Sequence, residues 1–245
     1  TEEIWAYLKL RGAIEVKIIG HDNKNYPDLR DDPREKANDP SLAVELAKDF
    51  DIYINEAFAT SHRKHCSIDA LPRLMKQQGK QVGIGLRFEK ELEALGNIFI
   101  EGYKVLVIGG TKVIDKNRYA KELSAKFSIV LKGGLLEGSP LREDKLDITK
   151  ESVNSYIDEI ETAKLIVAAG VMGKYEDPSS EYGTKEVLTA IASSKAYKIA
   201  GGGDIEAAIS KYNLADKFDW ISVGGGAMLE YLSSGTLVGI EAIEV

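Results

Sequence analysis

Cysteine, histidine and long apolar runs are scarce in this chain of 245 residues. Its single cysteine, Cys66, cannot close a disulfide within the chain, which favours a reducing compartment. The three histidines lack the ordered carboxylate or thiolate partners that a zinc-type site needs. No apolar run is long enough to span a bilayer and no signal peptide is recognisable. We therefore expect a cytoplasmic protein without a membrane partner.

An excess of basic residues is also missing. The chain has 32 Lys and Arg against 39 Asp and Glu, a net charge of −7. Duplex nucleic acid calls for a basic face, so we expect no nucleic-acid partner. Any basic cluster must be local and directed at a small anion. The hydrophobic content of 44% is ordinary for a globular protein, and the length suffices for one or two domains. We expect a monomer.

Glycine, in contrast, is concentrated at the ends of predicted strands. The run 196–200 stops at three glycines, 201–203, and a helix-favouring run over 204–212 follows at once. The same order recurs at 220–223, 224–226 and 227–233, and Gly109-Gly110 follows a strand over 105–108. Glycine turns ahead of a helix expose backbone N–H groups and the positive end of the helix dipole to an anion. These turns either bind a phosphorylated ligand, which we favour, or merely shorten the strand–helix loops.

The apolar periodicity predicts alternating strands and helices. In the first part of the chain it predicts strands over 13–20, 51–55 and 81–86 and helices over 2–10, 40–48 and 68–78, with Asp39 as a cap. The run 21–38 has no periodicity. A predicted helix over 89–100 joins this first part to a second part of the chain. In the second part the periodicity predicts strands over 103–109, 127–132, 164–169, 196–200 and 218–223. It predicts helices there over 116–126, 149–162, 184–194, 204–212 and 227–233. This alternation is typical of an α/β fold with mainly parallel sheets.

Charged residues near these turns are candidate ligands of phosphate. Lys112 and Lys116 are four residues apart, which predicts one helical face, and they either reach phosphate oxygens or are solvated. Asp204 either favours a helix start or holds Mg²⁺ bound to phosphates. Glu176 is a solvated acid or accepts hydrogen bonds from ribose hydroxyls. The loop is neither a GxGxxG fingerprint nor a Walker A motif.

The densest basic cluster, Ser61-His-Arg-Lys-His-Cys66, follows the strand over 51–55. A guanidinium binds phosphate or carboxylate through two hydrogen bonds, so Arg63 with the neighbouring histidines predicts an anion site. We interpret Cys66 as a small buried residue rather than a nucleophile.

Six blocks of this sequence, in order, resemble the phosphoglycerate kinase family. They are INEAFATSHRKHCS (54–67), EKELEALG (89–96), VIGGTKVIDK (107–116), GVMGKYEDP (170–178), GGGDIEAAISKYNLADKF (201–218) and ISVGGGAMLEYLSSGTLVGIEAI (221–243). The resemblance implies two Rossmann-like domains joined by a helix, with a cleft between them that closes about a hinge. Residues 1–88 with 236–245 would bind 3-phosphoglycerate, 89–100 would form the joining helix, and 101–235 would bind Mg-ATP or Mg-ADP.

The resemblance also implies roles for single residues. Arg63 would bind 3-phosphoglycerate and act in catalysis, assisted by His21 and Arg30. Lys112 would stabilise the phosphoryl group in flight, and Lys116 the nucleotide phosphates. The remaining nucleotide positions would be Gly110, Thr111, Gly134, Val171, Glu176, Gly203, Asp204 and Ile205, with Asp204 also binding Mg²⁺.

The sequence departs from the family pattern in several places. The first strand with its RVDxNxP motif is absent, and Ala169, Val171 and Ile205 stand where the family usually has Asn, Pro and Thr. The chain is either a divergent, incomplete copy or a set of joined pieces of a longer protein. Abrupt joins near 22–30 and 134–146 favour the second. The predicted function is reversible transfer of phosphoryl between Mg-ATP and 3-phosphoglycerate. The alternative is a nucleotide-binding module without transfer activity.

Overall fold

The computed structural model describes residues 28–244. The helix expected over 2–10 and the strand expected over 13–20 lie outside these residues. The chain forms two compact units, one of Thr1–Leu92 with Thr236–Val245 (unit 1) and one of Glu93–Gly235 (unit 2). The division falls within helix α5 (Leu86–Gly96).

Unit 2 is built on a parallel sheet with the strand order β4-β3-β5-β6-β7. Its strands are β3 (Lys104–Ile108), β4 (Ile129–Lys132), β5 (Leu165–Ala169), β6 (Tyr197–Gly201) and β7 (Trp220–Ser222). Its helices are α6 (Val113–Leu123), α7 (Lys150–Thr162), α8 (Tyr182–Ser193), α9 (Gly203–Lys211) and α10 (Gly225–Ser234), and two 3₁₀ turns, η3 (Asn97–Phe99) and η4 (Ala215–Lys217), complete it.

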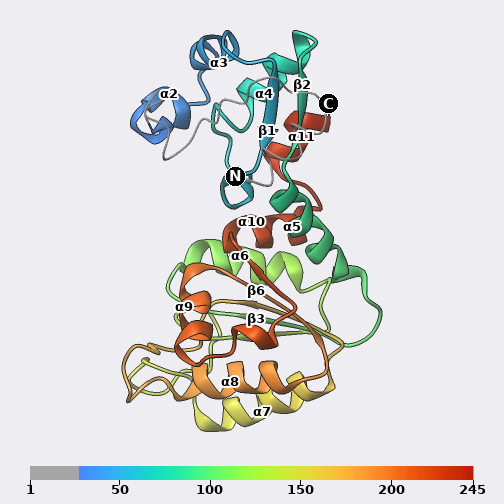
Figure 1. Cartoon of the computed structure of the whole chain (residues 1–245). Helices are drawn as coiled ribbons and strands as arrows, with labels where there is room; N and C mark the ends of the chain where they lie inside the picture. Colours follow the sequence, from blue (N-terminus) through green and yellow to red (C-terminus); the bar gives the residue numbers. More distant parts are fainter. Residues whose placement is uncertain (1–27, 245) are drawn as a thin grey trace. The chain divides into compact units, whose positions relative to one another are not determined.

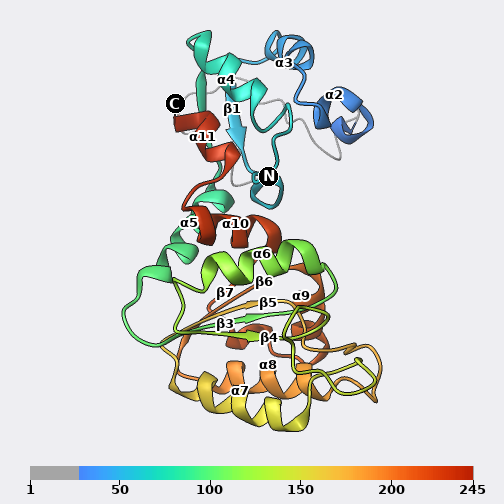
Figure 2. The ribbon, with the colours of Figure 1, turned by 180° about the vertical axis from the view of Figure 1, so that it is seen from behind.

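Helices cover both faces of this sheet (Figure 1). Figure 2 shows α6 and α10 on one face and α7 and α8 on the other. Every residue of β5 is buried, as is every residue of β3 after Lys104. Strands covered on both faces read as continuous apolar runs such as LIVAA, because no position faces water. On one face, apolar side chains of α7, α8 and α9 pack against β3 and β5 in a single core.

Unit 1 contains a parallel pair of strands, β1 (Ile52–Asn55) and β2 (Gln81–Ile84). Helices α3 (Pro40–Ala47), α4 (Ala70–Gln77) and α11 (Val238–Glu244) pack around this pair. The short elements η1 (Leu29–Asp31), α2 (Pro33–Lys36) and η2 (Phe58–Thr60) lie in the connections. The core joins Leu42 and Leu46 of α3 to Leu71 and Met75 of α4, with Cys66 buried among them.

Most predicted elements are confirmed within two or three residues, including the Asp39 cap, whose side chain accepts a hydrogen bond from the Ser41 N–H at 2.8 Å. One predicted element was wrong in its bounds. The helix expected over 89–100 begins at Leu86 and ends at Gly96, where a 3₁₀ turn follows, because Gly and Asn are poor helix formers. Part of the aperiodic run 21–38 is helical, since Asp32 caps α2 and Pro33 occupies its first position.

Candidate active site

The carboxyl ends of β3, β5 and β6, which are neighbours in the sheet, all run into glycines. Gly110, Gly170 and Gly202 adopt positive φ angles of 102°, 118° and 115°, a conformation that residues with a side chain rarely adopt. Strand β3 lies between β4 and β5, so the strand that follows it in sequence lies on one side of it and the next strand lies on the other. Ligands of open α/β sheets bind at the carboxyl edge where the strand order reverses in this way. Helices α6 and α9 begin here without a side-chain cap, which leaves N–H groups of their first turns available to an anion. The Val113 N–H at the start of α6 is an exception, because it donates to the Thr111 carbonyl at 2.9 Å.

The glycine turns pack so closely that larger residues would not fit. A β-carbon on Gly134, which has a φ of 58°, would lie 2.3 Å from the Gly110 nitrogen. The Leu135 N–H donates to the Gly110 carbonyl at 3.0 Å, which ties the end of β4 to the end of β3. A β-carbon on Gly225 would lie 2.8 Å from the Gly201 carbonyl oxygen, so the two glycine triplets lie side by side.

Lys116 lies in the first turns of α6 and turns its ammonium toward the sheet edge. Its Nζ donates to the carbonyl of Gly109 and, at 2.8 Å, to that of Ala169. Burial lowers the pKa of Lys116 to about 8; the nearby Lys112 charge lowers it further, and the Asp204 carboxylate opposes both. The side chain therefore carries a weakly solvated cation at the meeting point of β3 and β5, and an anion there would stabilise its charged form.

Lys112 does not share a helical face with Lys116, contrary to the prediction. Helix α6 begins at Val113, three residues earlier than expected, and Lys112 is its N-cap residue with non-helical φ and ψ of −80° and 69°. Both Lys112 and Thr111 are exposed. Within residues 28–244, the Lys112 ammonium forms no hydrogen bond or ion pair, so it is free to reach a ligand.

Asp204 is exposed in the first turn of α9 and faces the same space. Its Oδ2 lies 3.9 Å from the place that a β-carbon on Gly110 would take, close to the Lys116 ammonium. In the described part of the chain, no group of three or more His, Cys, Asp or Glu side chains could hold a metal ion. One carboxylate with phosphate oxygens is nonetheless a donor set that Mg²⁺ accepts. Asp204 thus fits a metal that arrives with a nucleotide.

Glu176 lies in the segment of residues 173–181 between β5 and α8, which we call the Glu176 loop. The side chain is exposed. Burial raises the pKa of Tyr175, and the charges of Glu176 and Asp204 raise it further, so both carboxylates lie near the Tyr175 hydroxyl. The structure thereby brings Glu176 and Asp204, 28 positions apart in sequence, to the same part of unit 2.

Val171 and Ile205 are buried, with exposed fractions of 7% and 1%, and belong to the core beneath the sheet edge. Their side chains therefore pack in the core, and only their backbones remain for contact with a ligand. Gly134 and Gly203 have no side chain and likewise offer backbone alone.

In unit 1, the loop of Arg63 follows β1 and η2. Arg63 and Lys64 are exposed, and neither side chain forms a hydrogen bond or an ion pair within the described chain. The buried Glu35 carboxylate fixes the loop: it accepts the Ser67 N–H at 2.9 Å and the Ser67 hydroxyl at 2.5 Å. Cys66 is fully buried, and burial raises the pKa of its thiol to about 12, which confirms a packing role.

The other two basic candidates of unit 1 are placed less directly. Arg30 is exposed on η1, and its Nε donates to the Asp28 carboxylate at 3.0 Å, so an acidic neighbour occupies part of its guanidinium. His21 lies outside the described residues.

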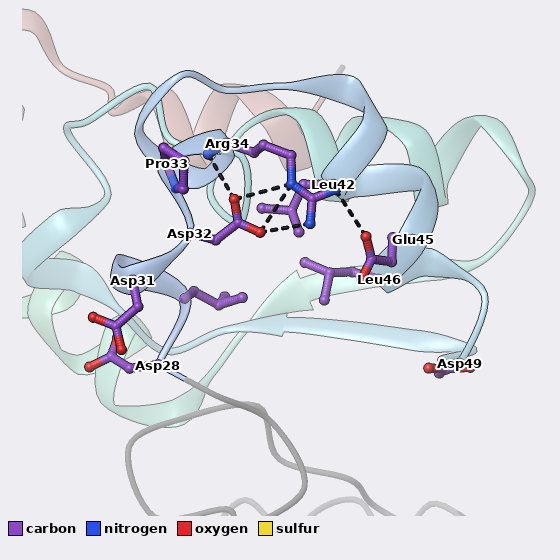
Figure 3. Close-up of a pocket in the computed structure, with 10 residues that line it drawn as sticks. Asp28, Asp31, Asp32, Pro33, Arg34, Leu42, Glu45, Leu46 and Asp49 are labelled. Carbon is purple, nitrogen blue, oxygen red and sulfur yellow. Dashed lines mark hydrogen bonds and ion pairs between the residues drawn. The ribbon is translucent and has the colours of Figure 1, made fainter.

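A cavity of about 630 Å³ opens in unit 1 between η1, α2 and α3 (Figure 3). Five carboxylates line it, together with Arg34, which Asp32 and Glu45 hold at 2.7 and 3.0 Å. This lining repels an anion such as a phosphate ester. The cavity contains none of the predicted site residues and is not a candidate for the acceptor.

Comparison with known proteins identifies the family. A family model described as phosphoglycerate kinase matches residues 26–141 and 136–235. The chain belongs to the phosphoglycerate kinase family. A phosphoglycerate kinase of Acidobacterium capsulatum is 33% identical over 281 positions, which cover 88% of this chain and 69% of the relative. One of Solibacter usitatus is 30% identical over 275 positions, with the same two coverages.

Solved structures agree with the family assignment. The phosphoglycerate kinase of Coxiella burnetii matches with a TM-score of 0.75 and 25% identity, over 88% of this chain and 71% of the other. That of Pyrococcus horikoshii gives 0.74 and 26%, over 89% and 71%. These matches confirm the predicted α/β class with mainly parallel sheets. Because the sequence alignments run over more positions than the 245 residues present, the relatives carry internal segments that this phosphoglycerate kinase homologue lacks.

Three residues that support the site were not predicted from the sequence. The Thr184 hydroxyl accepts the N–H groups of Met172 and Gly173 at 3.1 and 3.2 Å, and the buried Asp147 accepts the Gly183 N–H at 2.8 Å. Thr184 thereby holds the first residue of the Glu176 loop, and Asp147 holds the first turn of α8, which follows the loop. Lys211, at the end of α9, holds the loop at the Tyr175 carbonyl. No sequence signal marks these residues, because each acts on backbone atoms that lie far away in the sequence.

The helices formed by residues 28–244 include none with the length and apolar character needed to cross a membrane.

Proposed function

We propose that this chain catalyses the reversible transfer of the γ-phosphoryl group of ATP to the carboxylate of 3-phosphoglycerate. Membership of the phosphoglycerate kinase family supports this reaction. The observation that carries it is the convergence of three glycine turns with Lys112, Lys116 and Asp204 at one sheet edge of unit 2. The alternative, a nucleotide-binding module without transfer activity, is not favoured by the comparisons.

The nucleotide phosphates would lie over the start of α9, near Gly203 and Lys116. Backbone N–H groups at a helix start and a buried ammonium are complementary to phosphate. The ribose would lie near Glu176, whose exposed carboxylate accepts hydrogen bonds from hydroxyl groups. Gly110 and Gly134 would let the nucleotide approach the backbone. Val171 and Ile205 would contribute main-chain contacts.

The acceptor would bind through Arg63 in unit 1, with His21 and Arg30 as further ligands. 3-Phosphoglycerate carries a phosphate and a carboxylate, and a guanidinium recognises either group through two hydrogen bonds. The Arg63 and Lys64 side chains are exposed and have no side-chain partner in the described chain, as a site for a ligand with two anionic groups requires.

Phosphoryl transfer requires no covalent intermediate with the protein. The acceptor carboxylate is already ionised at neutral pH, so no general base is needed. Positioning and charge neutralisation lower the barrier instead. Lys112 would be the cation that stabilises the phosphoryl group as it moves. Mg²⁺, when bound with the nucleotide, would neutralise phosphate charge, and Asp204 is the residue that would hold it.

Two titrations and one rate measurement test this proposal. Calorimetry on the full chain should show binding of ADP in the presence of Mg²⁺ and, separately, of 3-phosphoglycerate. A coupled assay should show phosphoryl transfer. ADP binding without 3-phosphoglycerate binding would leave only the nucleotide-binding module, and absence of both would overturn the function altogether. A monomeric state and a cytoplasmic location remain predictions.

A further inference from the structure

Lys211 is the last residue of α9 and reaches the Glu176 loop. Its Nζ donates to the Tyr175 carbonyl at 2.7 Å and to the Glu181 carboxylate at 2.8 Å. The Tyr212 hydroxyl donates to the same carboxylate oxygen at 3.3 Å. The ammonium also lies 5.7 Å from the centre of the Tyr175 ring and 5.5 Å from that of Tyr212. One cation thus binds the Glu176 loop on both sides of Glu176.

Other contacts hold the same loop at different points. The Arg142 guanidinium donates to the Ser179 carbonyl at 3.0 Å and to the Ser180 hydroxyl at 3.1 Å. Lys174 donates its N–H to the Leu146 carbonyl at 2.8 Å. Lys211 differs from these anchors because its bond to the Tyr175 carbonyl restrains the peptide group that leads directly into Glu176.

The Glu176 side chain depends on such a restraint. It is exposed, and within the described residues its carboxylate has no hydrogen-bond or ion-pair partner. Its position is therefore set by the backbone from which it projects. The peptide group between Tyr175 and Glu176 is held by a charge-assisted hydrogen bond, which is stronger than a neutral one.

Helix α9 connects this restraint to the phosphate end of the site. Gly203 and Asp204 lie in its first turn and Lys211 in its last, about 12 Å apart along the axis. The long Lys211 side chain returns toward the loop because helical side chains lean toward the N-terminus. One rigid element thus places both the phosphate-binding turn and the support of Glu176.

We propose that Lys211 is a positioning residue for nucleotide binding: through the Tyr175 carbonyl it holds Glu176 where the carboxylate meets the ribose hydroxyls. This inference rests on the proposed function, in which Glu176 binds the ribose. The simpler interpretation, a Lys211–Glu181 ion pair on the surface, predicts little effect of any kind.

The test compares ADP with 2′,3′-dideoxy-ADP, which lacks the ribose hydroxyls. Both are titrated with Mg²⁺ into the full chain and into Lys211→Met. The parent should prefer ADP by about tenfold or more, the value of a hydrogen bond to a charged group. Lys211→Met should lose about fivefold or more in ADP affinity and keep its affinity for the dideoxy nucleotide within about twofold. Lys211→Arg should keep most of the preference, because its guanidinium can still donate to the Tyr175 carbonyl.

Lys217→Met is the matched control, because the Lys217 side chain pairs only with the adjacent Asp216 in the described chain. This variant should leave both affinities unchanged. If Lys211→Met does not fold, Lys211→Gln is scored by the same ratio. The role of Lys211 is overturned if Lys211→Met leaves the ratio of the ADP affinity to the dideoxy-ADP affinity unchanged, whether or not both affinities fall. A parent without any preference for ADP overturns the ribose role of Glu176 as well, so the two failures are distinguishable.

Discussion

Replacing Lys116 by methionine should stabilise the free protein while abolishing tight nucleotide binding. A lysine pKa of about 8 in the folded protein, against about 10.4 in an unfolded chain, means that holding the charge costs about 3 kcal/mol. Losing the two hydrogen bonds to the Gly109 and Ala169 carbonyls offsets roughly 1–2 kcal/mol of this gain. Lys116→Met should therefore unfold with a free energy about 1–2 kcal/mol above the parent at pH 7.

The pH dependence identifies the cause. Between pH 8 and 10.4 the unfolded chain keeps a proton on Lys116 that the folded chain has lost, so the stability of the parent rises with pH. The variant lacks this group. Its advantage should shrink by about 1.4 kcal/mol between pH 7 and pH 9, because the parent gains that amount.

The assay is urea unfolding followed by circular dichroism at both pH values, paired with ADP titration in Mg²⁺. Lys121→Met is the control, because Lys121 is exposed on the same helix and should change neither quantity. A variant less stable than the parent at pH 7, or a stability gap that does not change with pH, would refute the argument from burial.

Three further predictions concern single positions. Lys112→Ala should lower kcat by about 100- to 1,000-fold in a coupled assay while changing nucleotide affinity little, because its charge acts on the moving phosphoryl group; a comparable kcat would make Lys112 a surface residue. Arg63→Lys should weaken 3-phosphoglycerate binding by about 1.5–3 kcal/mol in calorimetry and leave ADP binding intact; unchanged affinity would move the acceptor site elsewhere. Gly134→Ala should cost about 2–4 kcal/mol in urea unfolding, because its β-carbon would meet Gly110. Gly79→Ala, with a φ of 76° and open space around it, should cost about 1–2 kcal/mol; equal losses would disprove the close approach.

The strands and helices of unit 2 were predictable because local patterns encode them. A run such as LIVAA at β5 has no polar position, as expected of a strand buried on both faces, and the predicted helices on either side of it favour a strand. The glycine triplets mark strand–helix turns for an equally local reason, since Gly202 takes a φ of 115° that other residues avoid. The edge of the sheet where the site forms follows from the parallel direction of these strands.

Contacts between distant segments were not predictable in this way. The sequence predicted Lys112 and Lys116 on one helical face, but the start of α6 depends on how the turn after Gly110 packs, and Lys112 became its cap. Likewise, nothing local assigns Val171 and Ile205 to the core. The first residue of a helix and the burial of a side chain both depend on contacts with residues that are distant in sequence and meet only in the folded chain.

The sequence alone determined the parallel α/β class, the glycine turns and the charged residues placed after them, because each depends on backbone preference or on period. Only the tertiary structure decided that Lys116 turns inward to the Gly109 and Ala169 carbonyls, and that Lys211 supports the Glu176 loop from 36 residues away. The physical reason is that the pKa of a lysine and the position of a loop depend on burial and on hydrogen bonds across the fold, which adjacent residues do not encode.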